Sequence, residues 1–479
     1  MKENKYPLFR RGCIIAFLVW IVTILFWQSA VLSFCLAALP VIITMIWREK
    51  EFPAMPFALG FQWLQVSIGI IWRDVFGAKL NAVNHPKIES ACYLGIIGLL
   101  VLGLAFRLGF MLGDRIFSIK ALPESSDNAK YSINKVFAVY LVLLFLTPMI
   151  VNVSWKFMQI RSILTAVFPL QYFIIFLLFY LSITYDRSIF ILGILSLEVL
   201  QGMVGYFSGY KTSLLIFAIV AFADLRKLTL RMRYILLGVI LSLFVLSVVW
   251  QAIKPELRRA FSSGGISLNS SWEEKLKFVY SLADKIFRGG DTRTQPDQYK
   301  VYGLVDRISN IYYFANVLSN VPSEIPHEDG KLLGASIKHL FSPRLFFPDK
   351  PGLASDSWMV RLYANVYVAG DEKDTNIALG YLVEDYIDFG IPYMFIPVFI
   401  LGFLAAIMYR YIFKVAINSL FANLLSASIF FFNFYLFETA NIKMFGNILS
   451  NYIVCLAWLM LFQKQFLEFI TKKYYPRVA

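Results

Sequence analysis

Long apolar segments, separated by short polar connections, dominate this chain. A bilayer core about 30 Å thick is crossed by roughly 20 helical residues, so each such segment predicts a transmembrane helix. The segments that fit are 12–28, 29–47, 57–73, 91–112, 134–153, 165–185, 188–207, 211–225, 233–251, 390–413, 416–437 and 446–466. Two of them are short and the first two almost merge, so the number lies between ten and thirteen. The pattern predicts an all-α polytopic membrane protein with about 12 transmembrane helices.

One connection, residues 252–389, is much longer than the others. It spans 138 residues, and loops of this length without secondary structure are uncommon in compact proteins. Ser271 and Glu274 form a capping-box pattern ahead of apolar residues at helical spacing. A second helical pattern contains Leu304, Ile308, Ile311, Tyr312, Ala315 and Leu318. We therefore expect an N-terminal transmembrane bundle over 1–251, with about nine helices, a mainly helical cap over 252–389, and C-terminal transmembrane helices with a tail over 390–479.

Composition and charge agree with a membrane protein. Hydrophobic residues make up 58% of the chain and charged residues 16%, whereas soluble proteins carry about 25% charged residues. Nineteen Lys and Arg lie in the short connections on one side of the predicted membrane and seven on the other, which predicts cytoplasmic termini. The long connection is then external and nearly neutral, with 16 Lys and Arg against 18 Asp and Glu. The net charge of +14 thus reflects membrane orientation, and we expect no nucleic acid partner.

The cysteines and histidines predict no metal centre. The four cysteines are scattered without a CxxC motif or a pairing with histidine, and His327 and His339 have no cysteine or carboxylate at ligand spacing. We expect no bound metal.

The first candidate site is Ser-Gly-Tyr-Lys-Thr-Ser at residues 208–213. Gly209 permits a tight turn, and Lys211 stands where the next predicted helix begins, near its positive dipole. A cation at a helix N-terminus suits an anion such as phosphate. A lysine that extends to the membrane interface would give the same pattern.

The second candidate site is a proline-rich stretch from Phe341 to Gly352. Its three prolines hold the backbone extended or turned, so that Arg344 and Lys350 are presented on a stiff frame. Arginine can bind a diphosphate in bidentate fashion, and lysine adds a mobile point charge. The alternative is a proline-rich turn with its charges in water.

The third candidate site runs from Asn376 to Gly390 and carries three carboxylates within five residues. A carboxylate that is partly desolvated at a membrane boundary has a raised pKa and can serve as a general base. Asp385 and Asp388 are expected to be ordinary surface carboxylates at a helix start.

Together these stretches resemble the Wzy-type polymerases of bacterial surface polysaccharides, also called O-antigen or oligosaccharide repeat-unit polymerases. The resemblance is carried by Gly209 to Thr212, by the Pro-Arg-x-x-x-Pro-x-Lys-Pro string from Pro343 to Pro351, and by the pattern from Gly380 to Gly390. The order of these motifs and the large external connection also agree, and the motifs lie between about residues 205 and 402. Lys211 is a departure, because many relatives have arginine there and lysine cannot bind phosphate in bidentate fashion.

The resemblance implies an integral membrane glycosyltransferase of the bacterial cytoplasmic (inner) membrane, similar in fold to the GT-C class. It implies polymerisation of undecaprenyl-diphosphate-linked repeat units on the outer face into O-antigen, capsule, common antigen or exopolysaccharide. Undecaprenyl diphosphate would leave, with no nucleotide sugar, cofactor or obligatory metal. The implied partners are the lipid-linked glycans, the lipid bilayer, a chain-length regulator and a flippase.

On this resemblance we expect external cations to stabilise the departing diphosphate, with Arg344 as the first candidate. The supporting cations are Lys211, Lys350 and Arg361. Glu384, or Asp356 in its place, is expected to accept the proton of the attacking sugar hydroxyl.

Other functions stay open at the level of the sequence. An O-antigen ligase-like glycosyltransferase would use the same donor but another acceptor. A lipid-linked oligosaccharide flippase or another transporter belongs to a different class; transporters commonly show internal repeats, and none is evident in this sequence. A structural membrane protein without enzymatic activity is the least favoured alternative.

Overall fold

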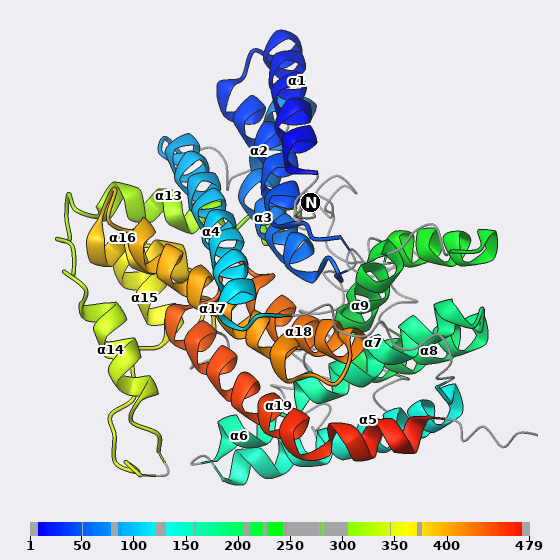
Figure 1. The fold of residues 1–479 in the computed structure, drawn as a ribbon. Helices are drawn as coiled ribbons and strands as arrows, with labels where there is room; N and C mark the ends of the chain where they lie inside the picture. Colours follow the sequence, from blue (N-terminus) through cyan, green and yellow to red (C-terminus); the bar gives the residue numbers. More distant parts are fainter. Residues whose placement is uncertain are drawn as a thin grey trace, which may run out of the picture. The chain divides into compact units, whose positions relative to one another are not determined.

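The computed structural model describes most of the chain, and most of the described residues are helical (Figure 1). The described residues contain no β-strand and one isolated bridge, between Tyr131 and Thr471. They are 8–49, 51–77, 85–119, 131–157, 160–204, 210–223, 228–242, 305–344, 346–370 and 376–471, with residues 245, 277, 280 and 281. The expected all-α architecture is confirmed for this part of the chain.

Nine labelled helices precede the predicted external connection. They are α1 (Phe9–Trp27), α2 (Ala30–Ile46), α3 (Ala54–Phe76), α4 (Ile88–Ile116), α5 (Ile133–Lys156), α6 (Arg161–Thr165), α7 (Phe168–Thr184), α8 (Ser188–Val204) and α9 (Tyr210–Ala223). Residues 230–242 are also helical.

Seven labelled helices follow in the second half of the chain. They are α13 (Ile311–Asn320), α14 (Lys331–Leu340), α15 (Asp356–Tyr363), α16 (Tyr381–Phe389), α17 (Phe395–Val415), α18 (Ser419–Phe434) and α19 (Asn441–Ile470).

Seven of the described helical segments are long and apolar enough to cross a membrane. They lie at Phe9–Trp27, Ala54–Phe76, Ile88–Ile116, Ile133–Ser154, Ile163–Thr184, Phe395–Val415 and Asn441–Ile470. Four further apolar helices, α2, α8, α9 and α18, are shorter. Helices therefore occur at the predicted apolar segments, and seven of them meet the length that a bilayer requires.

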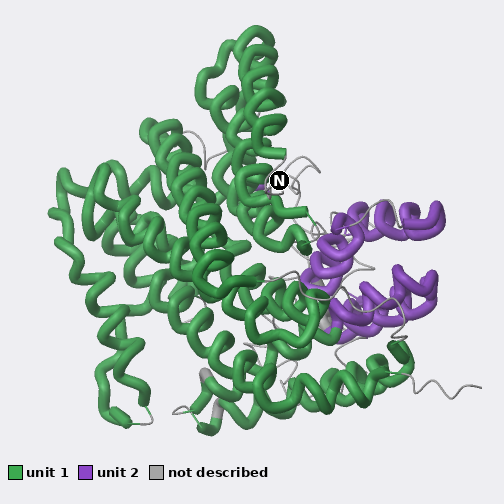
Figure 2. The backbone as a smooth tube through the Cα atoms, in the orientation of Figure 1, with its two compact units in different colours: residues 1–174, 308–479 green, residues 175–307 purple. Residues whose placement is uncertain are grey.

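The chain forms two compact units, one of residues 1–174 and 308–479 and one of residues 175–307 (Figure 2). The boundary at residue 308 falls inside the predicted cap over 252–389. The helical pattern at Leu304 to Leu318 is confirmed, since residues 305–308 and α13 are helical and α13 buries Ile311 and Ala315. The pattern after Ser271 lies almost wholly outside the described residues.

The core of the first unit is built around α18, which is buried along almost its whole length. Beside it, α4 and α17 approach closely because glycines lie at their contact. A Cβ atom on Gly109 of α4 would lie 2.6 Å from the carbonyl oxygen of Phe403, and one on Gly402 of α17 would lie 2.6 Å from Leu102 Cδ1. Small residues at such contacts are typical of packed membrane helices.

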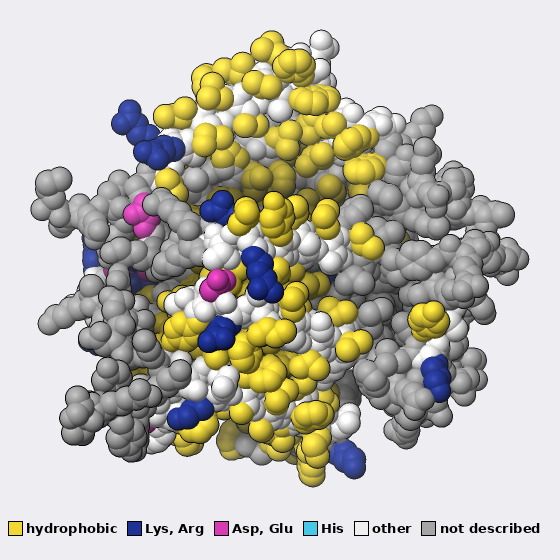
Figure 3. Space-filling model, turned by 90° about the vertical axis from the view of Figure 1, so that its right-hand side faces the viewer, with side chains coloured by type: hydrophobic (Ala, Val, Ile, Leu, Met, Phe, Trp, Pro, Cys, Tyr) yellow, Lys and Arg dark blue, Asp and Glu magenta, His cyan; other side chains and the backbone are white. Residues whose placement is uncertain are grey.

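Large hydrophobic side chains are also exposed, as expected where a helix faces lipid. Ile396, Ile400 and Leu404 form one ridge along α17 and are each more than half exposed. In the view of Figure 3, hydrophobic side chains cover much of the described surface, with Lys and Arg scattered among them.

Candidate active site

The start of α16 lies against the segment that connects α18 to α19. Gly380 has a φ of +106°, and a Cβ atom there would lie 2.4 Å from the carbonyl oxygen of Phe437. The next residue, Tyr381, donates its backbone N–H to the carbonyl of Thr439 at 2.7 Å. Only glycine fits both the backbone conformation and the close approach, so Gly380 positions the carboxylates that follow it.

Two buried glutamines of α3 hold the same connecting segment. Gln62 donates through Nε2 to the carbonyl of Phe434 at 2.5 Å and accepts from the Tyr381 hydroxyl at 2.8 Å. Gln65 accepts the backbone N–H of Phe437 at 2.8 Å. Three elements distant in sequence are thereby fixed around α16, because buried polar groups retain their hydrogen-bond partners.

Glu384 and Asp385 of α16 meet the first residue of α19. Glu384 Oε2 accepts the backbone N–H of Asn441 at 2.9 Å, and Asp385 Oδ1 accepts from Asn441 Nδ2 at 2.9 Å. Both carboxylates are buried. Their hydrogen bonds to Asn441 replace part of the hydration that burial removes.

Asp356, at the start of α15, forms an ion pair with Lys443 of α19. The side chain of Lys443 is 45% exposed, whereas that of Asp356 is 10% exposed. The Asn376 amide bridges the pair in the orientation that satisfies both groups: its nitrogen donates to Asp356 Oδ2 at 3.1 Å and its oxygen accepts from Lys443 Nζ at 2.7 Å. Asp356 is close enough to Glu384 for its charge to act on that carboxyl. We call Asp356, Glu384, Asp385, Asn441 and Lys443 the carboxylate cluster.

Burial changes the acidity of Glu384. Desolvation raises its pKa to about 8, the charges of Asp356, Asp385 and Asp388 add to the increase, and the hydrogen bond from Asn441 opposes it. Burial also raises the pKa of Asp385 well above its ordinary value. A carboxyl group with a pKa near neutrality can exchange its proton with a substrate hydroxyl, which is the property required of a general base.

Asp388 has a structural role that its position in the sequence did not indicate. Its two carboxylate oxygens accept the backbone N–H groups of Leu332 at 3.0 Å and Leu333 at 2.7 Å, at the N-terminus of α14. Asp385 and Asp388 are each 1% exposed, so the expectation that they are surface carboxylates is wrong. The physical reason is that α14 and α19 pack over α16 and supply the hydrogen bonds that burial demands.

The proline-rich stretch brings two predicted cations together beyond the end of α14. Lys350 Nζ donates to the carbonyl of His339 at 2.9 Å, and Pro343 accepts the backbone N–H groups of Phe346 and Phe347 at 3.0 Å. Burial lowers the pKa of His339, and the charges of Lys350 and Arg344 lower it further. The predicted turn therefore places Arg344 and Lys350 within electrostatic reach of one side chain.

The other two predicted cations lie elsewhere. Arg361, on α15 with Asp356, donates through Nε to the carbonyl of Val368 at 2.8 Å and stacks on the Tyr367 ring. Lys211 lies on α9 in the second unit, close enough to Arg307 for their charges to interact. Gly209 lies outside the described residues. The first unit thus contains Asp356, Glu384, Arg344, Lys350 and Arg361, whereas Lys211 belongs to the other unit.

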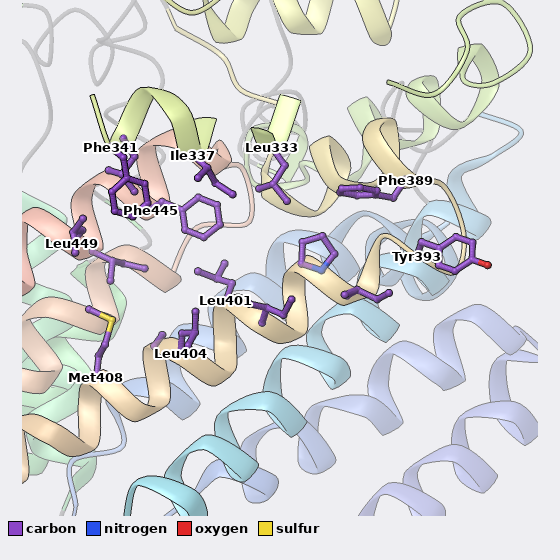
Figure 4. Close-up of a pocket in the computed structure, with 16 residues that line it drawn as sticks. Leu333, Ile337, Phe341, Phe389, Tyr393, Leu401, Leu404, Met408, Phe445 and Leu449 are labelled. Carbon is purple, nitrogen blue, oxygen red and sulfur yellow. The ribbon is translucent and has the colours of Figure 1, made fainter. Parts of the chain in front are cut away.

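A groove with a volume of about 640 Å³ lies between α14, α17 and α19 (Figure 4). We call it the apolar groove, because hydrophobic side chains line almost all of it. Leu333 and Ile337 contribute from α14, Leu401 and Leu404 from α17, and Phe445 from α19. The groove and the carboxylate cluster share α19, on which Phe445 follows Asn441 by about one turn.

Sequence reasoning missed Lys443, Asn441 and the two glutamines of α3. In the sequence, Lys443 is one of the seven Lys and Arg in the short connections on the predicted external side. The available signal was the density of polar residues from Glu438 to Lys443, directly before a long apolar segment. Polar side chains at the end of a membrane helix are costly unless they have partners, so they indicate a site.

A family model described as a domain of unknown function (DUF8712) matches residues 113–468, and the chain belongs to that family. The matched region contains the carboxylate cluster, the apolar groove and all of the predicted cations. No curated protein and no solved structure matches the chain.

Proposed function

We propose that this protein is a membrane glycosyltransferase that polymerises undecaprenyl-diphosphate-linked oligosaccharide repeat units into a surface polysaccharide. The proposal rests mainly on the environment of Glu384. Its carboxyl is buried where the N-terminal ends of α16 and α19 meet, and its pKa is raised. A scaffold protein has no need for a cluster of desolvated carboxylates, whereas transfer to a sugar hydroxyl requires a base. The resemblance to Wzy-type polymerases supports the same reaction.

In the proposed reaction one bond forms, one bond breaks, and a residue of this chain accepts the proton. The acceptor hydroxyl oxygen forms a bond to the anomeric carbon of the donor glycan and gives its proton to the Glu384 carboxylate. The bond from that carbon to the diphosphate oxygen breaks, and undecaprenyl diphosphate leaves with the electron pair. Arg344 stabilises this negative charge first, with support from Lys350 and Arg361. Asp356, held by Lys443, is the substitute base.

The proposal includes a membrane topology. The seven long apolar helices, the four shorter ones and the helix at residues 230–242 would together give twelve spans, in a fold similar to the GT-C class. The excess of Lys and Arg supports cytoplasmic termini in the bacterial inner membrane, with residues 252–389 on the outer face. A flippase would supply the lipid-linked units, and a chain-length regulator would be a further partner.

Deletion in the native cell tests the class of function. The proposal predicts that long polysaccharide chains disappear and that single repeat units stay on their lipid. Long chains that persist on lipid without attachment would instead identify a ligase. Accumulation of lipid-linked units on the cytoplasmic face would identify a flippase.

A further inference from the structure

We propose that Cys35 and Cys92 form a disulfide bond that joins α2 to α4 near the outer face of the membrane. This inference rests on the membrane topology proposed above, but it involves neither the carboxylate cluster nor sugar transfer. It follows from the contact between the two thiols, the packing around them and the end of the helices at which they lie.

The two cysteines lie together in the core of the first unit. Cys35 of α2 and Cys92 of α4 are both buried, and their thiols are hydrogen-bond partners. The carbonyl of Cys35 accepts the indole N–H of Trp63 on α3 at 2.7 Å. The thiol of Cys92 donates to the carbonyl of Val66, also on α3, at 3.4 Å. Trp63 and Val66 are about one helical turn apart, so α3 holds both cysteines at nearly the same height.

Contacts on either side of the cysteines show that α2 and α4 run side by side in the same direction. The rings of Phe34 and Tyr93, which are next to the cysteines in sequence, have their centroids 5.3 Å apart. Further along both helices, a Cβ atom on Gly103 would collide with the end of the Met45 side chain. Such close packing is what a disulfide requires, because its two Cβ atoms lie only about 4 Å apart.

Both cysteines lie near the ends of their helices that the topology places outside. Ser29, directly before α2, donates its hydroxyl to Asp74 near the end of α3 at 2.6 Å. Arg73 of α3 forms an ion pair with Glu89 at the start of α4 at 3.0 Å. The excess of Lys and Arg predicts that this end is external. Both cysteines are within the first six residues of their helices, about 8 Å or less from these starts.

Disulfide bonds form and persist in the oxidising surroundings outside a cytoplasmic membrane. The oxidant in this proposal is the disulfide of a thiol–disulfide oxidoreductase on that side. The thiolate of one cysteine attacks this disulfide to form a mixed disulfide, and the thiolate of the second cysteine then displaces the oxidoreductase. The two thiols lose two electrons and two protons in total, and the oxidoreductase leaves as a dithiol. Because the folded protein buries both thiols, the exchange precedes the final packing of α2 against α4.

The number of free thiols in the full-length protein from its native cell tests this inference. Cells are quenched in acid, the protein is denatured, and free thiols are labelled with a maleimide polyethylene glycol before and after reduction. The wild type should take up two labels without reduction and four after it. The matched controls change the cysteines outside the pair: Cys13→Ser and Cys455→Ser should each take up one label without reduction and three after it. Four labels on the unreduced wild type would overturn the proposal.

Peptide mapping identifies the bonded partners without a change to either cysteine of the pair. Trypsin releases residues 12–48 and 88–107 from the Cys13→Ser variant, each with one cysteine. These two peptides should remain linked until the disulfide is reduced. A link between other cysteines would overturn the proposal.

The thiol count requires no sugar transfer. A Cys35–Cys92 bond in a protein that forms no polymer would therefore contradict the proposed function alone. Polymer formation by a protein with four free thiols would contradict the disulfide alone.

Discussion

The backbone N–H of Asn441 donates to Glu384 Oε2 at 2.9 Å and joins the first turn of α19 directly to the buried carboxylate of α16. The Asn441 side chain makes a second bond, to Asp385 Oδ1. Glu384 therefore has its position and part of its acidity set by a residue 57 positions later in the chain. Any movement of α19 would change the site.

Glu384→Gln should abolish transfer while the protein stays folded. Glutamine keeps the size of the side chain and one oxygen acceptor for Asn441, but it cannot take a proton. Loss of a general base typically lowers a rate by about 10²–10⁴-fold. The rate of polymer formation by the purified variant measures this effect, and the melting temperature of the variant shows whether it is folded. A variant with full activity would remove Glu384 from the mechanism.

The pH dependence of polymer formation should follow the same carboxyl. Because its pKa is raised to about 8, the basic form is a minority at pH 7, and the rate should increase between pH 7 and pH 9. The residual rate of Glu384→Gln should lack this increase. A wild-type rate that is flat over this range would contradict the assignment.

The stability of the protein should depend on pH in the opposite direction. The folded protein keeps the Glu384 proton up to a pKa of about 8, whereas an ordinary glutamic acid loses it near 4.5. The contribution of this group to stability is therefore fully present below pH 4.5 and is lost as the pH rises through 8. Thermal unfolding of the wild type and of Glu384→Gln between pH 5 and pH 9 isolates this contribution, since the glutamine variant lacks it.

Arg344→Ala should remove long chains in cells and leave single repeat units on lipid. The guanidinium is expected to stabilise the departing diphosphate, and donors of this kind contribute about 10²–10³ to a rate. Gel ladders of polysaccharide length measure the outcome, with the amount of protein in the membrane as the control. Normal ladders at normal protein amounts would exclude Arg344 from the reaction.

Asp388→Ala should destabilise the protein through α14. Asp388 accepts two backbone N–H groups at the start of that helix, and loss of such a cap costs about 0.5–2 kcal/mol. Asp388→Asn keeps one oxygen acceptor and should lie between the wild type and the alanine variant in melting temperature. Asp349→Ala, at an exposed carboxylate, is the matched control. Equal melting temperatures of Asp388→Ala and Asp349→Ala would show that Asp388 does not cap α14.

The positions of helices could be predicted from the sequence, but their surroundings could not. The segment at 416–437 corresponds to α18, and the one at 91–112 corresponds to α4. Yet α18 is buried along almost its whole length in protein, whereas the α17 ridge at Ile396 is exposed. Lipid and protein interiors are equally apolar, so hydropathy does not distinguish them.

The candidate site could be predicted only where its residues are close in sequence. Arg344 and Lys350 lie in consecutive turns of one proline-rich stretch, and Glu384 lies within one short motif. Gln62 and Tyr381 form a hydrogen bond across 319 residues, and Lys443 pairs with Asp356 across 87. A single sequence carries no signal for such distant pairs, because tertiary packing alone brings them together.

Incubation of the purified protein with undecaprenyl-diphosphate-linked repeat units, with no nucleotide sugar present, is the decisive experiment for glycan transfer. We expect a ladder of polymers of increasing length and release of undecaprenyl diphosphate, both lost in Glu384→Gln. Unchanged single repeat units, under conditions in which the protein remains folded, would contradict it.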